Sequence, residues 1–341
     1  MVKVGVVGLG FMGGMHAQAY SILPNAQITA GVDADKQRRK EFAAKYGANA
    51  FPTIERMLAQ ADVNLVDICL PTNMHRRAVE KAAAAGKHIL CEKPIALTLR
   101  DADAMIAAVE RAGVKFMVAH VLRFWPEYTV IKDIVSSGRL GKIKSLTAAR
   151  LSPPPAWGWK QWFFQPKMSG GAVVDLHIHD LDQFAWLAGP PKTVFAGGLT
   201  NEFGAMQSVW TTCTHADGVV SFAQGSEMLP SNYPFTMTLT VCCEKGTIEL
   251  NSRLSPALTV YPVDGQPEHP AIPDLTGAAT SEEAMGNIQQ LGGYFAEIKY
   301  FVDCVENNRT PDVVTPADAR LALAMCLAAR KSALKGKPVS L

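Results

Sequence analysis

Two short segments of this sequence hold side chains suited to proton transfer, and the first is SGGAVVDLHIHDLDQFAWL. Asp175 and His179 lie four residues apart in it, so in a helix they would share one face. A carboxylate beside an imidazole gives a general base whose orientation and pKa can be set. Helix-capping acids with core histidines are the alternative. A metal site on His177 and His179 would need strand spacing and a third ligand, and the helical pattern argues against it.

The second segment is HILCEKPIAL, in which an apolar run ends on Glu92, Lys93 and Pro94. At the end of a buried strand, Lys93 could polarise a substrate oxygen. Pro94 would make the turn rigid, and an X-Pro peptide makes a cis bond accessible. A surface Glu–Lys pair that caps the strand is the alternative interpretation.

Near the N-terminus, Gly8, Gly10 and Gly13 form a G-x-G-x-x-G motif that encloses Phe11 and Met12. The motif follows an apolar strand and opens a helical pattern. This arrangement lets the backbone approach a pyrophosphate, whose negative charge the helix N-terminus favours. The sequence therefore predicts a dinucleotide site here, against the alternative of a plain turn before a helix.

An acidic residue, Asp33, ends the next strand 20 residues after Gly13. A carboxylate at this spacing accepts hydrogen bonds from ribose hydroxyls and repels a 2′-phosphate, which favours NAD. The cations that follow, Lys36, Arg38 and Arg39, could instead serve as phosphate partners for NADP, although such cations more often form a solvated helix face. We expect NAD as the cofactor, with NADP as the alternative.

A third strand ends in CLPTNMH, which places Pro71, Thr72 and Asn73 at the carboxyl edge of the sheet. Ligands of open α/β sheets bind at this edge. His75, just beyond, could contact the ribose or could start the next helix. We expect cofactor contacts from this segment and from Glu92 and Lys93.

An aromatic segment, PAWGWKQWFFQP, precedes the Asp–His segment and contains Trp157, Trp159 and Trp162. Indole faces can pack on the C–H faces of a sugar or cyclitol ring and leave its hydroxyls free for hydrogen bonds. Filling of a domain or subunit interface is the alternative. The side chains expected to bind those hydroxyls, beside Lys93 and His179, are Arg123, Lys160, Asp175 and His177.

The predicted secondary structure that must position these groups differs between the first and the later parts of the chain. From Val2 to about Val121, short β-rich runs alternate with helical patterns, which predicts a parallel sheet covered by helices on both faces. Later strand-like runs with few helices between them predict a mostly antiparallel sheet, completed by helices near 291–305 and 317–334. We expect an α/β Rossmann domain over residues 1–122 and an α+β domain with a large open sheet over residues 123–341.

The overall composition argues against several kinds of binding partner. The 341 residues carry 33 basic and 31 acidic side chains, a formal charge of +2 that argues against nucleic acid or an anionic membrane as partner. No apolar run approaches the roughly 20 residues that span a bilayer, and no export signal is recognisable. Seven cysteines, an odd number without zinc-ligand spacing, predict a reducing cytoplasmic location and no metal.

Together, GLGFMG, CLPTNMH, CEKP, SGG and DLHIHDLD resemble, in order and spacing, the glucose–fructose oxidoreductase / inositol dehydrogenase / rhizopine-catabolism (Gfo/Idh/MocA) family. The resemblance covers essentially the whole chain. It implies catalysis by Lys93, Asp175 and His179, and an open sheet face that forms a homodimer or homotetramer. In the family, an arginine often follows the tryptophan that precedes the glycines. In this sequence Phe163 follows Trp162 instead. By the resemblance, Trp162 is expected to contact the cofactor.

The resemblance predicts hydride transfer between nicotinamide and a secondary hydroxyl of a sugar or cyclitol. In this hypothesis Lys93 places a cation against the alcohol, His179 removes its proton, and Asp175 orients the histidine. A cofactor-bound sensor on the same fold is one alternative. A reductase of C=C or imine groups is the other, and it would show no activity with polyols.

Overall fold

The chain forms two compact units in the computed structural model, which describes residues 1–155, 158–275, 280–285 and 288–341. Unit 1 comprises Met1–Trp125 and Asp274–Arg320, and unit 2 comprises Pro126–Pro273 and Leu321–Leu341. The sequence predicted one boundary, between residues 122 and 123. The structure differs in that the chain returns to unit 1 for residues 274–320.

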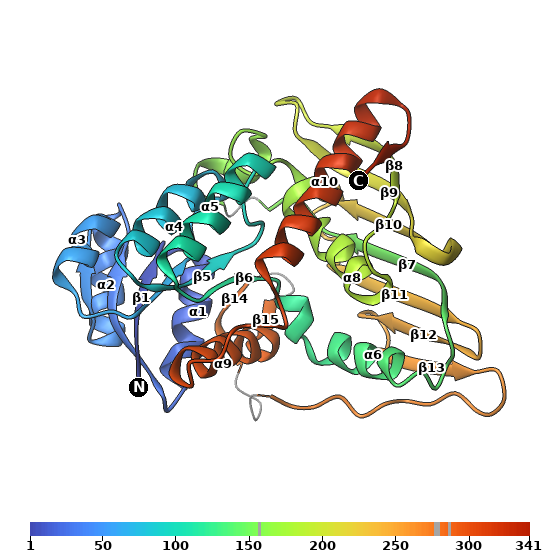
Figure 1. Ribbon diagram of the computed structural model, residues 1–341, viewed down its shortest axis with the longest axis horizontal. Helices are drawn as coiled ribbons and strands as arrows, with labels where there is room; N and C mark the ends of the chain where they lie inside the picture. Colours follow the sequence, from blue (N-terminus) through green and yellow to red (C-terminus); the bar gives the residue numbers. More distant parts are fainter. Residues whose placement is uncertain (156–157, 276–279, 286–287) are drawn as a thin grey trace. The chain divides into compact units, whose positions relative to one another are not determined.

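Unit 1 contains a six-stranded sheet in the order β3-β2-β1-β4-β5-β6, and every pair of neighbours is parallel (Figure 1). The predicted parallel sheet is thus confirmed. Its order reverses between β1 and β4, the place where doubly wound sheets bind ligands. The strands are β1 (Val2–Val7), β2 (Ala26–Val32), β3 (Asn49–Phe51), β4 (Leu65–Ile68), β5 (His88–Glu92) and β6 (Phe116–Ala119).

Helices cover both faces of this sheet, since right-handed crossovers in opposite directions place helices on opposite sides. α3 packs on α4 and α4 on α5, whereas α1 packs on α9 (Figure 1). β4 and β5 are therefore buried on both faces, which explains their continuous apolar runs. The helices are α1 (Phe11–Ser21), α2 (Lys36–Tyr46), α3 (Ile54–Gln60), α4 (His75–Ala84), α5 (Leu99–Ala112) and α9 (Gly292–Glu306).

Capping residues set the ends of several of these helices. The Asp35 side chain accepts hydrogen bonds from two N–H groups at the start of α2, and the Thr98 hydroxyl accepts one, from Asp101, at the start of α5. Gly47 and Gly113 end the two helices in the left-handed conformation. Short elements complete unit 1: η1 (Thr72–Met74), η2 (Val121–Phe124), and the antiparallel pair β14 (Thr280–Met285) and β15 (Ile288–Gln290).

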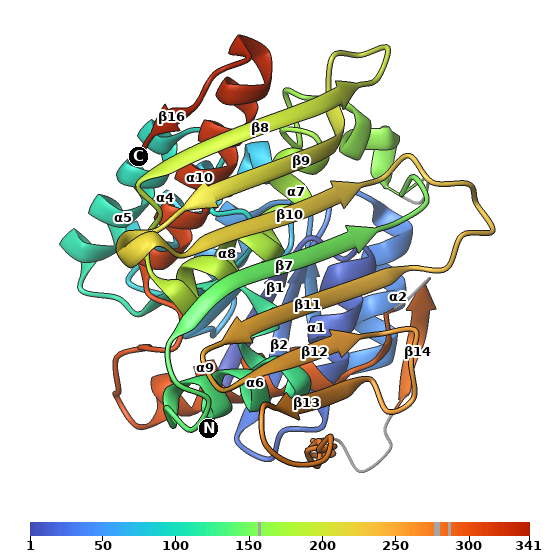
Figure 2. The ribbon, with the colours of Figure 1, turned by 90° about the vertical axis from the view of Figure 1, so that its right-hand side faces the viewer.

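Unit 2 is built on an eight-stranded sheet in the order β13-β12-β11-β7-β10-β9-β8-β16 (Figure 2). Most neighbours are antiparallel, as predicted, but β7 and β10 pair in parallel. The strands are β7 (Ile143–Leu151), β8 (Thr193–Thr200), β9 (Met206–Thr214), β10 (Val220–Ser226), β11 (Thr236–Cys243), β12 (Gly246–Asn251), β13 (Leu258–Pro262) and β16 (Val339–Ser340).

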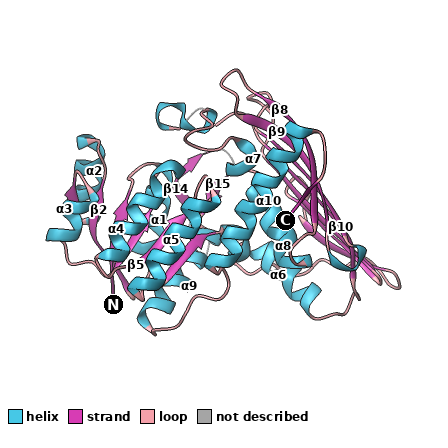
Figure 3. Ribbon diagram, turned by 45° about the horizontal axis from the view of Figure 1, so that its top comes forward, coloured by secondary structure: helices cyan, strands magenta, loops and turns pink. Residues whose placement is uncertain are grey.

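The helices of unit 2 lie on one face of its sheet, seen edge-on in Figure 3. The other face carries half-exposed apolar side chains: Phe195 is 48% and Phe222 39% exposed. Both flank Thr212 in register across β8, β9 and β10, so they form one row. The helical segments are α6 (Pro126–Ser136), η3 (Trp159–Phe164), α7 (Ala172–Asp175), α8 (Ile178–Ala188), η4 (Ala216–Gly218) and α10 (Pro316–Lys335), which begins in unit 1.

The helix expected near 172–187 is divided into α7 and α8 by Leu176 and His177. Gly170 and Gly171, each with φ of +81°, lead the chain into α7. Asp175 therefore ends one helix and His179 stands in the first turn of the next. Within the described residues, no helix has the length and apolar character needed to cross a membrane, and all seven cysteines are free thiols.

Candidate active site

The glycine loop after β1 is shaped by close backbone contacts. A Cβ atom on Gly8, which has φ of +94°, would lie 2.5 Å from the Cys69 carbonyl oxygen, and one on Gly13 would lie 1.9 Å from the Gly8 carbonyl oxygen. Only glycine fits either position. α1 begins at Phe11, next to Met12, and Gly10 before it offers no side-chain cap to the first N–H groups of the helix. These groups suit an anion such as a pyrophosphate.

Asp33 stands directly beside this loop, at the end of β2. One carboxylate oxygen accepts the Leu9 N–H at 2.9 Å and the other accepts the Asp35 N–H at 2.8 Å. The side chain is thus held in a fixed orientation with lone pairs left for ribose hydroxyls. Arg38 Nη1 lies 3.9 Å from Asp33, while Arg39 donates to the Asp33 and Ala34 carbonyls. Arg39 is therefore committed to the backbone in this conformation.

Pro71, Thr72 and Asn73 follow β4, and Thr72 is buried at the start of η1. His75 is fully buried and faces two backbone carbonyls, Leu70 at 2.8 Å from Nε2 and Pro94 at 3.0 Å from Nδ1. Burial lowers the pKa of His75. This placement favours a structural role for His75 over contact with the ribose, because its imidazole lies between the Leu70 and Pro94 carbonyls of two loops at the carboxyl edge.

Glu92 ends β5, and Lys93 follows at the same edge of the sheet. The Lys93–Pro94 peptide is cis, and the Lys93 N–H donates to Glu92 Oε2 at 3.0 Å. Burial alone would raise the pKa of Glu92, but the neighbouring His16 and Lys93 lower it. The Lys93 side chain is only partly buried, so an ammonium group stands beside an ionised carboxylate at the strand end.

In unit 2, Asp175 is buried and His179 is partly exposed, with its Nδ1 atom in the interior. Beneath them, Arg150 of β7 makes a two-pronged ion pair with Asp180, at 2.9 and 3.2 Å, and also donates to the Tyr128 hydroxyl. Burial raises the pKa of Asp180 although Arg150 opposes the shift. This buried pair fixes the first turn of α8, in which His179 stands.

Two predicted substrate contacts are deeply buried. His177 is 0% exposed and its Nε2 lies 2.9 Å from the Thr211 hydroxyl; burial, with Arg150 adding to it, lowers its pKa to about 3. Arg123 is 3% exposed, donates to the Val313 carbonyl and lies 3.3 Å from Asp318. These placements favour structural roles over the predicted contacts with a substrate.

The aromatic segment is described from Gly158 onward, so Trp157 lies outside the described residues. Trp159 is 49% exposed and the Lys160 ammonium stands 4.7 Å from its ring centroid. Trp162 packs on Phe163, with ring centroids 4.1 Å apart. An exposed indole with an adjacent cation remains available to a polyhydroxylated ring.

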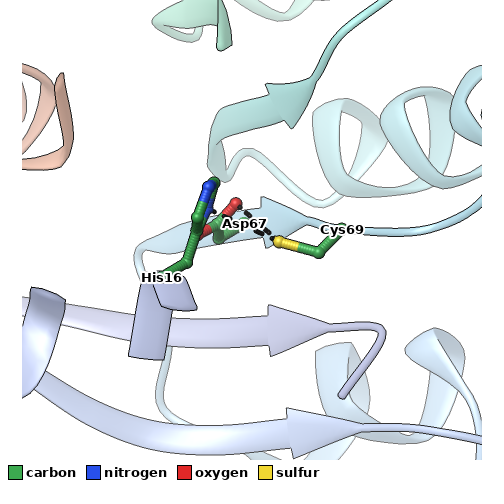
Figure 4. A group of neighbouring side chains, drawn as sticks. All are labelled: His16, Asp67 and Cys69. Atoms are coloured by element: carbon green, nitrogen blue, oxygen red, sulfur yellow. Dashed lines mark hydrogen bonds and ion pairs between the residues drawn. The ribbon is translucent and has the colours of Figure 1, made fainter. Parts of the chain in front are cut away.

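Sequence reasoning missed a buried ionic cluster in unit 1, centred on His16 of α1 (Figure 4). His16 Nδ1 lies 2.8 Å from Asp67 Oδ2, and Cys69 Sγ lies 3.5 Å from both residues. Asp67 could have predicted this cluster from the sequence, because a carboxylate inside a strand buried on both faces needs a polar or charged partner. His16, on a buried face of the helix that opens the cofactor loop, is that partner.

This combination, a glycine loop on an open parallel sheet with an acidic residue after the second strand, defines a dinucleotide-binding protein. Residues 2–120 match the oxidoreductase family with an NAD-binding Rossmann fold, and residues 128–249 match the GFO/IDH/MocA C-terminal domain. The chain therefore belongs to the GFO/IDH/MocA family of NAD-dependent oxidoreductases.

Similar proteins include the myo-inositol 2-dehydrogenase of Thermotoga maritima, 27% identical over 100% of this chain and 98% of that protein. The scyllo-inositol 2-dehydrogenase (NAD⁺) of Bacillus subtilis is 29% identical over 100% of this chain and 96% of its own. Levoglucosan dehydrogenase in complex with NADH and levoglucosan superposes with a TM-score of 0.85 over 99% of both chains; at 24% identity this likeness shows the fold.

Proposed function

We propose that this protein is an NAD-dependent dehydrogenase that oxidises a secondary hydroxyl of a sugar or cyclitol. The observation that carries the proposal is the gathering of three motifs at the carboxyl edge of one parallel sheet. The glycine loop follows β1, Asp33 follows β2, and Glu92–Lys93–Pro94 follows β5. The names of the inositol dehydrogenases to which the chain is similar support the substrate class.

The residues present fit NAD. The glycine loop and the N-terminus of α1 would hold the pyrophosphate, and Asp33 would accept hydrogen bonds from ribose hydroxyls, with Pro71, Thr72, Asn73 and Trp162 as further contacts. When bound, NAD supplies the hydride acceptor. The fixed carboxylate of Asp33 favours NAD over NADP, because a 2′-phosphate would meet like charge.

Three side chains of this protein carry the acid–base work in the proposal. Lys93 holds a cation against the substrate oxygen and stabilises the negative charge that develops there. His179 removes the hydroxyl proton at Nε2, since its Nδ1 lies in the interior. Asp175, on the preceding turn, orients the imidazole and binds a neighbouring hydroxyl.

The substrate class rests on Trp159 and Lys160, which present an aromatic face and a cation together. We expect Trp159→Ala to raise the KM for the sugar or cyclitol several-fold and to leave the KM for NAD unchanged. Unchanged sugar kinetics, with an altered oligomeric state, would assign Trp159 to an interface and remove this support for a carbohydrate.

A homodimer or homotetramer and a cytoplasmic location complete the proposal. The open face of the unit 2 sheet exposes Phe195, Val220 and Phe222 side by side. An apolar surface of this kind is typical of protein interfaces, and a second copy of this chain is the occupant we propose. Seven free thiols suit a reducing compartment.

The decisive experiment replaces Lys93 with methionine. Because a positioned acid or base contributes about 10²- to 10⁴-fold to rate, we expect turnover of inositols and sugars to fall by that factor. NAD binding, followed by fluorescence, should persist. Lys87→Met, at the opposite end of β5, is the matched control and should keep wild-type activity. Full activity in Lys93→Met would refute the lysine assignment, and NAD binding without any polyol turnover in the wild type would favour a sensor.

A further inference from the structure

The buried cluster around His16 lies directly behind the Glu92–Lys93–Pro94 turn. His16 is 0% exposed and stands one helical turn after Gly13, on the helix that opens the glycine loop. Its two ring nitrogens face two carboxylates: Nδ1 meets Asp67 of β4 at 2.8 Å, and Nε2 lies 3.2 Å from Glu92 Oε1 of β5. The second contact is at ion-pair distance rather than in a well-aligned hydrogen bond.

Glu92 connects His16 to the backbone of the Glu92–Lys93–Pro94 turn. While Oε1 faces His16, Oε2 accepts the backbone N–H of Lys93 at 3.0 Å. A continuous polar path therefore runs from the helix of the cofactor loop, through two buried side chains, to the backbone of the lysine. His75 holds the next residue of the turn, Pro94, from another side.

Against the carboxylates of Asp67 and Glu92, an imidazolium at His16 and the ammonium of Lys93 together balance the charge of the cluster. Burial alone would lower the pKa of His16, but the Asp67 carboxylate and the Cys69 sulfur raise it well above its usual value. A third buried carboxyl, Glu297, has its pKa raised well above its usual value, by burial first and then by Glu92, which favours its neutral form. Among the described side chains, the groups near His16 are Tyr20, Asp67, Cys69, Glu92, Tyr294 and Glu297.

We propose that His16 is a positioning residue for the reaction: as a buried cation between Asp67 and Glu92, it fixes the turn that presents Lys93. The proposal rests on the proposed role of Lys93. His16 itself touches neither substrate nor reacting atoms.

Loss of the imidazole would leave two carboxylates in the interior without the cation that lies between them. An unpaired buried charge is strongly destabilising, so Glu92 would take up a proton or move toward water. Either change alters the acceptor of the Lys93 N–H and displaces the ammonium group. A shift of about 1 Å at such a group costs on the order of 100-fold in rate.

A first experiment reads the charge of His16 without any turnover. In protein labelled with ¹⁵N-histidine, an imidazolium shows protons on both ring nitrogens. We expect His16, identified by the signal lost in His16→Asn, to keep both protons at about pH 8, well above the ordinary histidine pKa of about 6.5. One ring proton at that pH, from a neutral ring or from a metal ion bound with Asp67 and Cys69, would overturn the proposal.

A second experiment is a double-mutant cycle with Glu92→Gln. If His16 acts by compensating the charge of Glu92, the losses in kcat for His16→Asn and Glu92→Gln should not multiply in the double variant. We expect His16→Asn to lower kcat at least tenfold. The kcat of the double variant should be no lower than that of the less active single variant. Multiplying losses, or an unchanged kcat in His16→Asn, would refute the role.

His215→Asn is the matched control. His215 is also buried, and its ring nitrogens contact the Gly189 carbonyl and the Ser221 hydroxyl, remote in sequence from the turn. This variant should lower the melting temperature and leave kcat and the pH profile unchanged. Failure of the proposed function appears separately, as full activity in Lys93→Met, while the NMR result on His16 stands by itself.

Discussion

Replacing Gly13 with alanine tests the cofactor loop at its tightest point. The added Cβ would lie 1.9 Å from the Gly8 carbonyl oxygen and 3.0 Å from its carbonyl carbon. Real Cβ contacts are longer than 3.0 Å, so the loop and α1 must separate by more than 1.1 Å. Since both atoms belong to backbone, no side-chain rotation can relieve the overlap.

That displacement sets the size of the effect. Overpacking of this kind costs about 1–3 kcal/mol of folding stability. A misplacement of about 1 Å in groups that hold a ligand costs on the order of 100-fold. We therefore expect Gly13→Ala to weaken NAD binding by roughly 100-fold and to lower the melting temperature.

The assay is titration with NAD by fluorescence or calorimetry, beside thermal unfolding without ligand. Gly292→Ala is the control in the same unit, because no described atom beyond its chain neighbours and the backbone of its own helix lies within 4 Å of the Cβ it would add. It should bind NAD normally. A Gly13→Ala protein that binds NAD within about twofold of wild type would refute the assignment of this loop to the pyrophosphate.

Three further predictions concern other parts of the chain. Asp33→Ser should lower kcat/KM with NAD by about 10- to 100-fold, the loss of a charged hydrogen bond, and raise the NADP/NAD ratio; an unmodified enzyme that prefers NADP would contradict this. The pKa of His177, lowered to about 3 by burial, lies below its unfolded value, so stability should fall as pH drops from about 6.5 to about 3, by up to about 1.4 kcal/mol per pH unit. His177→Gln should flatten that dependence in urea unfolding at several pH values, and an unchanged slope would show that other groups dominate. Phe222→Lys should shift light scattering toward smaller species, because charge is depleted from interface cores; an unshifted oligomer would place the interface elsewhere.

Much of unit 1 could be predicted because its signals are local. Gly8, Gly10 and Gly13 mark a turn whose sterics require glycine, and the alternation of strand and helix fixes a parallel sheet. β3 (Asn49–Phe51) escaped the sequence analysis because three residues are too few to show periodicity. The return of α9 to unit 1 escaped it because an amphipathic pattern does not say which sheet the helix will cover.

In unit 2, the mixed sheet and the helix break depended on long-range packing. β7 and β10 pair in parallel although β8 and β9 lie between them in the sequence. Sequence periodicity through residues 172–187 suggested one helix, whereas the fully buried side chain of His177 sits at the junction of two. The buried contacts of Arg123 and His177 likewise could not be read from residue type.

The division of unit 1 into two stretches of sequence has a consequence for synthesis on the ribosome. The first 125 residues emerge early, but α9, which covers α1 and brings Tyr294 against Trp125, emerges only after residues 126–273. Until then the ionic cluster on α1 lacks part of its cover, and the nascent dinucleotide-binding half stays incomplete. We therefore expect cofactor capture to wait until α9 has left the exit tunnel, a period in which chaperones have access to the open face of α1.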